Sequence, residues 1–347
     1  MKFRSYPNSD VTVSEVGFGL WTTSTGWWGE NTEEEAVALL HRAYDLGITL
    51  YDAADTYGSG RSEDQLAAAF SDRRSSVVYA TKFGYDFSNA GERARGQSEL
   101  PQNFSTAFVR RALEASLRRL RTEYVDIYQM HNARMSQIED DALWELLENL
   151  KHEGKIRLYG VALGPAIGWL YEGVDAVRRR NVPSLQIIWN MLEQYPGNEQ
   201  IRAAYDAGAS TGYMIRVPHS SGLLEGRYTA QTTFPPNDHR RHRPRQWLIN
   251  GVEKVEQLRF LERDDRTLGQ AALQWLLAEP RVMTVLPNIY DAAQLAEFAA
   301  APESPALTKD ELERISALSA RNFGIEEAPP AFKGTMNRES AEAALAQ

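Results

Sequence analysis

The chain reads VDIYQMHNARMSQIEDDALWELLENLKHEGKIRLYGV from Val125 to Val161. Residues 125–130 and 157–161 are short apolar runs rich in β-branched and aromatic side chains, as expected for strands buried on both faces of a parallel sheet. Residues 138–152, between them, place their apolar side chains at helical spacing. The segment is therefore predicted to form a βαβ unit, in which one helix connects two parallel strands.

The same pattern recurs along the whole chain. Strands are predicted at residues 16–20, 49–52, 77–81, 125–130, 157–161, 184–189, 211–217 and 282–286. The helices that follow them are predicted at residues 33–46, 62–70, 107–121, 138–152, near 171–180, 199–207, 268–278 and 292–300. At the start of the chain, residues 3–6 and 11–14 flank a polar turn and are predicted to pair as a β-hairpin.

About eight βα units without a break in composition predict an α/β fold, a (β/α)8 TIM barrel. This barrel would form a single domain over residues 1–320, followed by a C-terminal extension over residues 321–347. A doubly wound sheet is the alternative, and it predicts a Gly-x-Gly-x-x-Gly motif after an early strand. Gly17 and Gly19 supply the first two glycines, but Thr22 stands at the third position. The pattern therefore favours the barrel.

Composition narrows the class of protein. The 347-residue chain is 43% hydrophobic and carries a formal net charge of −9, which excludes intrinsic disorder and argues against a nucleic-acid partner. No apolar run approaches the roughly 18 residues of a membrane helix. The N-terminus has no apolar signal segment, so a cytoplasmic location is expected. The chain has no cysteine, and its six histidines form no zinc motif, so no metal site is expected.

In a (β/α)8 barrel the active site lies at the C-terminal ends of the strands. Asp52 and Tyr57 follow the second predicted strand, Lys82 ends the third and His131 follows the fourth. A tyrosine can act as a general acid, a lysine can stabilise its anion, an aspartate can hold the lysine, and a histidine can orient a substrate oxygen. Each residue alone is more often a cap or a packing residue. Together they predict a catalytic site.

Three segments carry a family resemblance. Residues 51–63 (YDAADTYGSGRSE), 80–82 (ATK) and 126–131 (DIYQMH) closely resemble the motifs of the aldo-keto reductase superfamily, and the resemblance extends from the hairpin to about residue 320. It implies a barrel that binds NADP or NAD without a Rossmann domain and transfers a hydride between the cofactor and a carbonyl carbon. Tyr57 would then protonate the carbonyl oxygen, Lys82 paired with Asp52 would favour the tyrosinate, and His131 would donate a hydrogen bond or share in the proton relay.

The resemblance also assigns cofactor contacts and a substrate wall. The expected cofactor contacts are Gly19, Trp21, Gln186, Arg216, Pro218, Ser220, Gly222, Leu223, Asn288 and Gln294. Trp21, Trp27 and Trp28 are expected to line the substrate pocket, with ordinary aromatic packing as the alternative.

Several cofactor positions depart from the family pattern. Ala162 and Leu163 replace a Ser-Asn pair that holds the nicotinamide carboxamide, and Arg216 replaces a tyrosine that stacks under the nicotinamide ring. Residues 288–298 contain no Lys or Arg and include Asp291. Because an adenosine 2′-phosphate needs cationic partners, preference for NADP is predicted to be weak and NAD at least competitive. Alternatively, an arginine of the basic cluster in the long loop 222–250, namely Arg240, Arg243 or Arg245, supplies the missing charge.

Three functions remain open. The first is an oxidoreductase acting on small carbonyl or alcohol substrates such as aldehydes, ketones or sugars, with Tyr57 as general acid or base. The second is an NAD-dependent sugar or polyol dehydrogenase that runs oxidatively on the same residues. The third is a regulatory subunit that senses the cofactor with little turnover. The substrate, the preferred direction and the oligomeric state are not predicted.

Overall fold

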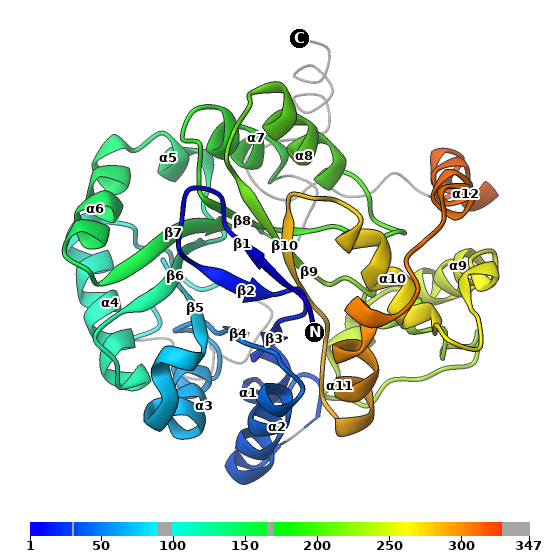
Figure 1. Cartoon of the computed structure of the whole chain (residues 1–347), viewed down its shortest axis with the longest axis horizontal. Coiled ribbons are helices and arrows are strands. Elements are labelled where there is room, and N and C mark those ends of the chain that lie inside the picture. The colour runs from blue at the N-terminus through cyan, green and yellow to red at the C-terminus, as the bar shows by residue number, and fades with distance from the viewer. Residues whose placement is uncertain (30, 89–98, 165–168, 328–347) are drawn as a thin grey trace.

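The computed structural model describes residues 1–29, 31–88, 99–164 and 169–327. Eight parallel strands form one nearly closed sheet that is surrounded by helices (Figure 1). Neighbouring strands follow one another in chain order. Their bounds are β3 (Phe18–Gly19), β4 (Leu50–Asp52), β5 (Val78–Phe83), β6 (Val125–His131), β7 (Ile156–Ala162), β8 (Ser184–Ile188), β9 (Gly212–Arg216) and β10 (Val282–Leu286).

The sheet closes where the first strand meets the last. Val16, just before β3, forms a parallel bridge with Val285 of β10, and the Gly17 amide donates to the Val285 carbonyl at 2.9 Å. This closure and the sequential strand order confirm the predicted (β/α)8 barrel. They exclude a doubly wound sheet, in which the strand order reverses at a switch point.

The principal helices lie outside the barrel at the predicted places. They are α2 (Glu33–Asp45), α3 (Arg61–Phe70), α4 (Thr106–Leu120), α6 (Asp141–His152), α7 (Leu170–Arg178), α8 (Gly197–Asp206), α10 (Leu268–Leu277) and α11 (Ala292–Ala299). The predicted helix 138–152 is divided, because Asp140 accepts a hydrogen bond from the Ala142 amide at 3.1 Å and caps α6. A short helix, α5 (Met135–Ile138), precedes this cap. None of the described helices is long and apolar enough to cross a membrane.

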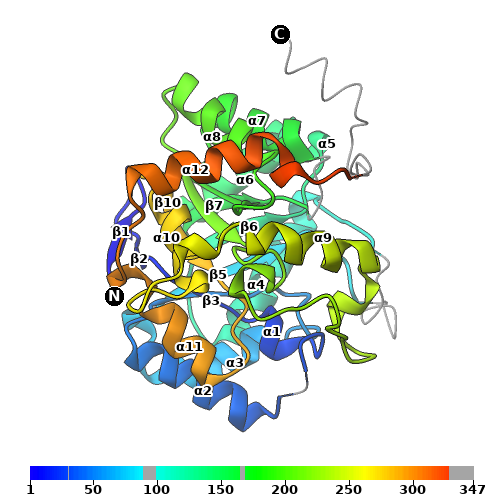
Figure 2. The same cartoon turned by 90° about the vertical axis from the view of Figure 1, so that its right-hand side faces the viewer.

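The predicted hairpin covers one end of the barrel. Its strands, β1 (Phe3–Ser5) and β2 (Thr12–Ser14), pair antiparallel. Tyr6, Val11 and Val13 are buried and share an apolar cluster with inward side chains of the sheet, such as Ile127 and Met214. Figure 1 looks onto this end, and Figure 2 shows the hairpin at the left edge, away from α9 (Arg245–Glu256). The hairpin therefore seals the N-terminal end of the barrel.

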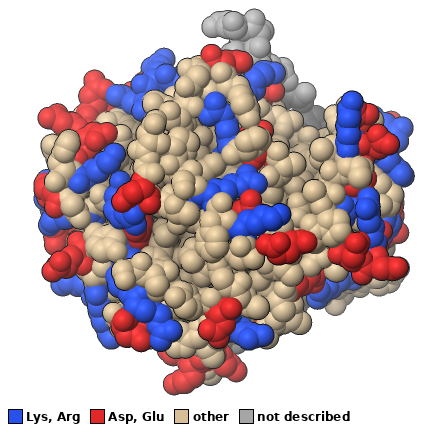
Figure 3. Space-filling model, in the orientation of Figure 1, with Lys and Arg blue, Asp and Glu red and all other residues tan. Residues whose placement is uncertain are grey.

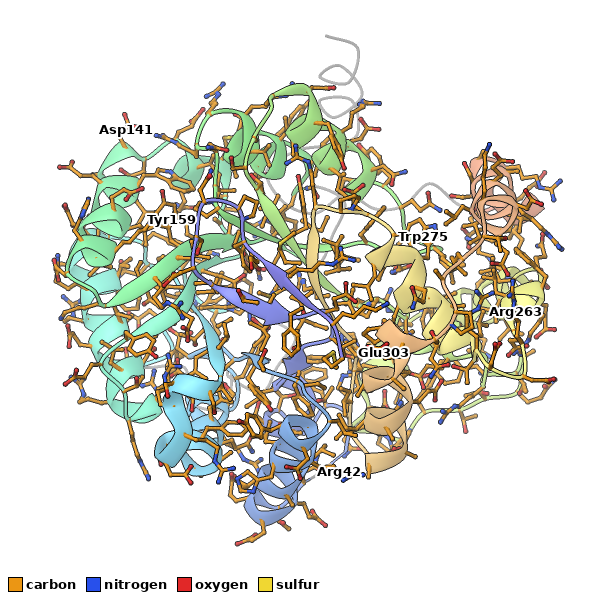
Figure 4. All side chains as sticks on the ribbon, in the orientation of Figure 1. Arg42, Asp141, Tyr159, Arg263, Trp275 and Glu303 are labelled. Carbon is orange, nitrogen blue, oxygen red and sulfur yellow. The ribbon has the colours of Figure 1, made fainter. Side chains whose placement is uncertain are left out.

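Outward side chains of the strands pack against the helices. Tyr159 on β7, labelled in Figure 4, donates to Glu148 of α6 at 2.5 Å, and its ring centroid lies 5.9 Å from that of Trp144.

On the face that carries the hairpin, basic and acidic side chains are interspersed (Figure 3).

The segment 222–250 has more local structure than a long loop. It contains 3-10 turns at Leu223–Glu225 and His239–His242, and α9 begins within it. Leu248 and Val255 of α9 belong to a second apolar cluster, with side chains of α10 and α12 (Lys309–Ala320). This packing stabilises α9. The sequence pattern did not predict this helix, because the arginine-rich residues at its start obscure the helical spacing of its apolar side chains.

The beginning of the predicted C-terminal extension lies against α9. Gln257 donates to the Phe323 carbonyl at 2.7 Å, and Lys254 donates to Glu327 at 2.6 Å. The extension from residue 328 onward lies outside the described residues. A domain boundary at residue 320 remains a prediction.

Candidate active site

A layer of polar side chains lies inside the barrel above the apolar cluster. Successive side chains of a strand point to opposite faces of the sheet. On β6, Ile127 belongs to the apolar cluster, so Gln129 and His131 also point inward, nearer the C-terminal end. This end lies opposite the hairpin, as expected for the active site of a barrel.

Lys82 and Asp52 form a buried ion pair in this layer. Lys82 Nζ donates to Asp52 Oδ2 and to the Ala53 carbonyl, both at 2.7 Å, and its side chain is 0% exposed. Burial by itself lowers the pKa of Lys82, but the Asp52 carboxylate and the Tyr57 hydroxyl outweigh burial and raise the pKa above its ordinary value. Lys82 is therefore a cation at neutral pH.

Two glutamines hold the second oxygen of Asp52. Gln129 Nε2 donates to Asp52 Oδ1 at 3.2 Å, and Gln186 Nε2 donates to it at 3.1 Å. The sequence assigned Gln186 to the cofactor. In the structure its amide supports the ion pair, and its contact with the cofactor remains a prediction. Sequence reasoning missed Gln129, although its position two residues before His131 gives it the same inward orientation.

Tyr57 lies in the loop between β4 and α3, and its neighbours fix the shape of that loop. Gly58 has a φ of +61°, and a Cβ there would stand 2.5 Å from the Ser24 carbonyl oxygen, so the position requires glycine. Ser62 Oγ donates to the Ala54 carbonyl at 2.9 Å and accepts from the Ala54 amide at 3.3 Å. These contacts explain the glycine and serine of the motif at residues 51–63.

The structure brings together the four residues predicted to be catalytic. Lys82 Nζ is 4.7 Å from the centroid of the Tyr57 ring, and the ring centroids of Tyr57 and His131 are 5.8 Å apart. Tyr57 is partly exposed, whereas Asp52, Lys82 and His131 are buried. Tyr57 is therefore more accessible to solvent than the ion pair beneath it.

His131 is held neutral. Burial, followed by the charges of Lys82 and Arg216, holds the pKa of His131 well below its ordinary value. Tyr85 packs against the imidazole, with ring centroids 5.1 Å apart. Among the described residues, His131 Nδ1 has no hydrogen-bond partner. A neutral imidazole carries one N–H donor, so His131 is able to donate one hydrogen bond at neutral pH.

Arg216, the last residue of β9, faces the same site. Its Nη2 donates to the Leu163 carbonyl at 2.7 Å, and its charge interacts with Tyr57 and Asp52. Burial lowers the pKa of Arg216, but a guanidinium retains its proton in proteins. The cationic side chain of Arg216 therefore reaches from the end of β9 to the residue that follows β7.

The backbone directly after Arg216 is strained. Val217, Ser220 and Ser221 have φ values of 55°, 47° and 58°, and Gly222 has 93°. Left-handed backbone is unfavourable for non-glycine residues, above all for β-branched ones, and it clusters at ligand-binding sites. This loop contains the residues that the resemblance assigns to the cofactor at 218, 220, 222 and 223.

The same loop brings two serine hydroxyls close to charged side chains. Its main-chain amides at Ser220, Gly222 and Leu224 donate to carbonyls within the loop, so the side chains are its available polar groups. Arg243 Nη2 lies 3.4 Å from Ser221 Oγ, which brings a cation to the loop. Ser220 Oγ donates to Glu193 at 2.9 Å and so anchors the loop to the end of the neighbouring strand.

The segment after β10 has acidic side chains around it and no basic residue of its own. Asp291 caps α11 by accepting from the Gln294 amide at 2.8 Å. The Gln294 side chain donates to Glu225 at 2.9 Å, and burial raises the pKa of Glu225 to about 7. From Asn288 to Phe298 there is no basic residue. Two acidic side chains therefore flank Gln294, which was predicted to contact the cofactor.

Arg240 reaches this acidic region from the 222–250 segment. Its guanidinium lies 4.3 Å from the Trp28 ring centroid and interacts with Tyr290. Asp238 accepts hydrogen bonds from Arg240 Nε and Nη2, at 2.8 and 2.5 Å. Arg245 donates to carbonyls of its own segment instead. One arginine thus folds back toward the end of β10, with its charge already paired.

The three tryptophans form one aromatic cluster, near Gly19 at the end of β3. Trp21 contacts Trp27 and Trp28, with ring centroids 6.5 and 6.2 Å apart. His239 from the 222–250 segment packs edge-on against Trp21 at 5.2 Å. Trp21 and Trp27 are partly exposed, whereas Trp28 is only 7% exposed. Trp21 and Trp27 thus have the exposure expected of a pocket wall. Trp28 is buried, and the place of all three in the substrate pocket remains a prediction.

The comparisons with known proteins agree with this geometry. Residues 15–320 match the model of the aldo/keto reductase family. The solved holo form of aldo-keto reductase AKR11C1 from Bacillus halodurans is similar, with a TM-score of 0.74, 29% identity and coverage of 92% of this chain and 96% of that one.

Two curated relatives differ in the cofactor that their names carry. NADH-specific methylglyoxal reductase of Escherichia coli is 28% identical, covering 84% of this chain and 91% of the relative. Aldo-keto reductase yakc (NADP(+)) of Schizosaccharomyces pombe is 27% identical, covering 82% and 83%. With its closed barrel and the match over residues 15–320, the chain belongs to the aldo/keto reductase family of nicotinamide-dependent oxidoreductases.

Proposed function

We propose that the protein reduces small aldehydes, ketones or sugars, with Tyr57 as the general acid. The observation that carries this proposal is the position of Tyr57 above the buried Lys82–Asp52 ion pair and beside the neutral His131. A general acid must lie within hydrogen-bond reach of the oxygen that it protonates. Tyr57 combines partial exposure with an adjacent fixed cation.

In the reduction, the cofactor supplies a hydride to the carbonyl carbon. Tyr57 gives its hydroxyl proton to the carbonyl oxygen, so the C=O bond becomes CH–OH and the tyrosine becomes an anion. The Lys82 ammonium stabilises that anion, and Asp52 holds the ammonium in place. The neutral His131 donates a hydrogen bond that orients the carbonyl. Proton uptake from solvent then restores Tyr57.

The residues that would hold the cofactor lie along one side of this mouth. Arg216 would lie at the nicotinamide end, since its charge acts on both Tyr57 and His131. The strained loop with Ser221 and the nearby Arg243 suits the diphosphate, and Gln294 suits the adenosine end.

Two other functions use parts of the same site. An NAD-dependent sugar or polyol dehydrogenase would run the reaction in reverse, with tyrosinate as the base. A cofactor-sensing subunit would bind the cofactor but turn over little. The intact arrangement of Tyr57, Lys82 and His131 favours turnover over sensing. A carbonyl-dependent loss of dihydronicotinamide absorbance, assayed with NADH and NADPH over a panel of carbonyl compounds, tests the proposed reduction.

Lys82→Met is expected to lower kcat by roughly two orders of magnitude, within the contribution of about 10²–10⁴ that a general acid makes. The residual rate should extend to higher pH, because the tyrosine retains its proton longer without the adjacent cation. Asp52 loses its partner in this variant, and breaking a buried pair costs about 3–5 kcal/mol. Thermal melts and cofactor titrations therefore accompany the rate measurements. An unchanged rate and pH profile in the folded variant would contradict this role.

Trp27→Ala is expected to alter the preference among carbonyl substrates with little change in thermal stability, because the ring is partly exposed. Trp28→Ala is the matched comparison. Its buried ring stacks on Tyr290 at 5.9 Å, so its loss should lower the free energy of unfolding by about 3–5 kcal/mol. Relative kcat/KM values over substrates of different size, together with denaturant melts, measure both. Unchanged selectivity in Trp27→Ala would assign that residue to packing alone.

A further inference from the structure

Arg216 is an uncompensated charge in the catalytic end of the barrel. Its Nη2 hydrogen bond goes to a neutral group, the Leu163 carbonyl. Within the described residues, no carboxylate forms an ion pair with it, in contrast to Lys82, whose partner is Asp52. A partly buried cation without an acidic partner is costly unless it has a task in the site.

The other groups of the site leave this charge unbalanced. Lys82 and Asp52 neutralise one another, and His131 carries no charge at neutral pH. The Tyr57 hydroxyl is neutral before reaction. Arg216 therefore gives the site one net positive charge. Its field extends across the site, because it contributes to keeping His131 unprotonated.

The reacting ring of the cofactor must come close to this charge. The carbonyl oxygen of the substrate lies within hydrogen-bond reach of Tyr57, and a hydride donor must contact the adjacent carbon. The donor ring must thus lie close to Tyr57, and so within the field of Arg216, which acts on both Tyr57 and His131. This step rests on the proposed function.

We propose that Arg216 makes the site selective for the reduced cofactor over the oxidised one. The dihydronicotinamide ring is neutral, and it gains one positive charge when it gives up its hydride. In a chamber with a fixed net positive charge, the oxidised ring is repelled and the reduced ring is not. The protein is therefore loaded with the reduced cofactor and releases the oxidised product readily, which suits it to carbonyl reduction.

This selectivity has a cost in the chemical step. The same field opposes the appearance of charge on the ring, so the bound reduced cofactor is a somewhat weaker hydride donor. Removing the charge should consequently tighten the binding of the oxidised cofactor and change that of the reduced cofactor much less. Like charges in a partly buried site interact strongly enough to alter a binding constant by about tenfold or more.

The test measures four dissociation constants by quenching of tryptophan fluorescence, with NADH, NAD⁺, NADPH and NADP⁺ at one salt concentration. In the wild type, the oxidised form of each pair is expected to bind at least about tenfold more weakly than the reduced form. Arg216→Gln, which keeps a donor for the Leu163 carbonyl, should reduce that ratio by about tenfold through tighter binding of the oxidised form. Arg216→Lys, which keeps the charge, should retain most of the ratio.

Two controls separate the outcomes. Arg241→Gln removes an equal charge from an exposed position of the 222–250 segment and should leave the ratio unchanged. ADP-ribose, which lacks the nicotinamide ring, should bind equally to the wild type and Arg216→Gln. Equal binding of both oxidation states by the wild type overturns the proposal without any variant. So does a loss of affinity in Arg216→Gln that is the same for both states. Failure to bind any of the four cofactors would instead overturn the proposed function.

Discussion

Tyr57→Phe should lower the rate of carbonyl reduction by about 10²–10⁴, the range that a positioned general acid contributes. The substitution removes one hydroxyl and leaves the aromatic ring beside His131, so fold and cofactor affinity should be retained. The Lys82–Asp52 ion pair also remains intact, which makes this variant more specific than Lys82→Met. Steady-state kcat/KM values and cofactor titrations measure the two effects separately.

Tyr159→Phe is the matched control. It removes a tyrosine hydroxyl that faces α6 on the outside of the barrel, where it donates to Glu148. Its kcat/KM should remain close to that of the wild type. Near-normal turnover by Tyr57→Phe would contradict the assignment of the proton donor, and His131 would then be the next residue to examine.

The second large effect concerns the cofactor. NADPH should bind no more than about tenfold more tightly than NADH, and NADH should be at least competitive. A charge-assisted contact contributes about 1.5–3 kcal/mol, or one to two orders of magnitude in affinity. At the adenosine end, Gln294 lies between Asp291 and Glu225. The cations near it, Arg227 and Arg240, are already paired with Glu297 and Asp238.

The preference should also depend on pH. With a pKa raised to about 7, Glu225 is mostly neutral below that pH and negatively charged above it. A 2′-phosphate is repelled by the charged form, so the affinity for NADPH relative to NADH should fall as pH rises through about 7. Glu225→Gln should remove the part of this dependence that exceeds titration of the phosphate itself. Dissociation constants for both reduced cofactors at about pH 6 and pH 8 provide the measurement.

A hundredfold preference for NADPH would refute this argument. Its source could then be located with Arg240→Ala, Arg243→Ala and Arg245→Ala. Arg240 would be the first candidate, since it reaches Tyr290 at the end of β10. Arg245 would be the last, because its donors are occupied by carbonyls of its own segment.

Local sequence pattern was sufficient to predict the barrel. Strands buried on both faces and amphipathic helices differ clearly in the spacing of their apolar residues along the chain. The catalytic end followed, since side chains at parallel strand ends meet at one edge. Contacts between segments that are far apart in the chain could not be predicted from local sequence pattern. Nothing near Asp52 in sequence indicates that Gln129 and Gln186 bind its second oxygen.

The backbone conformation after β9 could not be predicted from the sequence either. Val217 is β-branched and reads as part of a strand, yet its φ is 55° because the following turn directs the chain over the barrel mouth. The position of Arg240 was predicted only in part. Its approach to the end of β10 was one of three alternatives, but its pairing with Asp238 depends on a turn that only the folded segment supplies.

The hairpin also determines when the newly synthesised chain can complete its fold. Arg4 donates to the carbonyls of Leu277, Glu279 and Val282, which lie 273 to 278 positions away along the chain. Contacts of such long sequence separation form late, because a large loop must close before they are made. The hairpin strands therefore lack these final partners until β10 has been synthesised. Until then the apolar residues of the hairpin have only part of their packing surface, and the barrel floor is sealed only after β10 has been made.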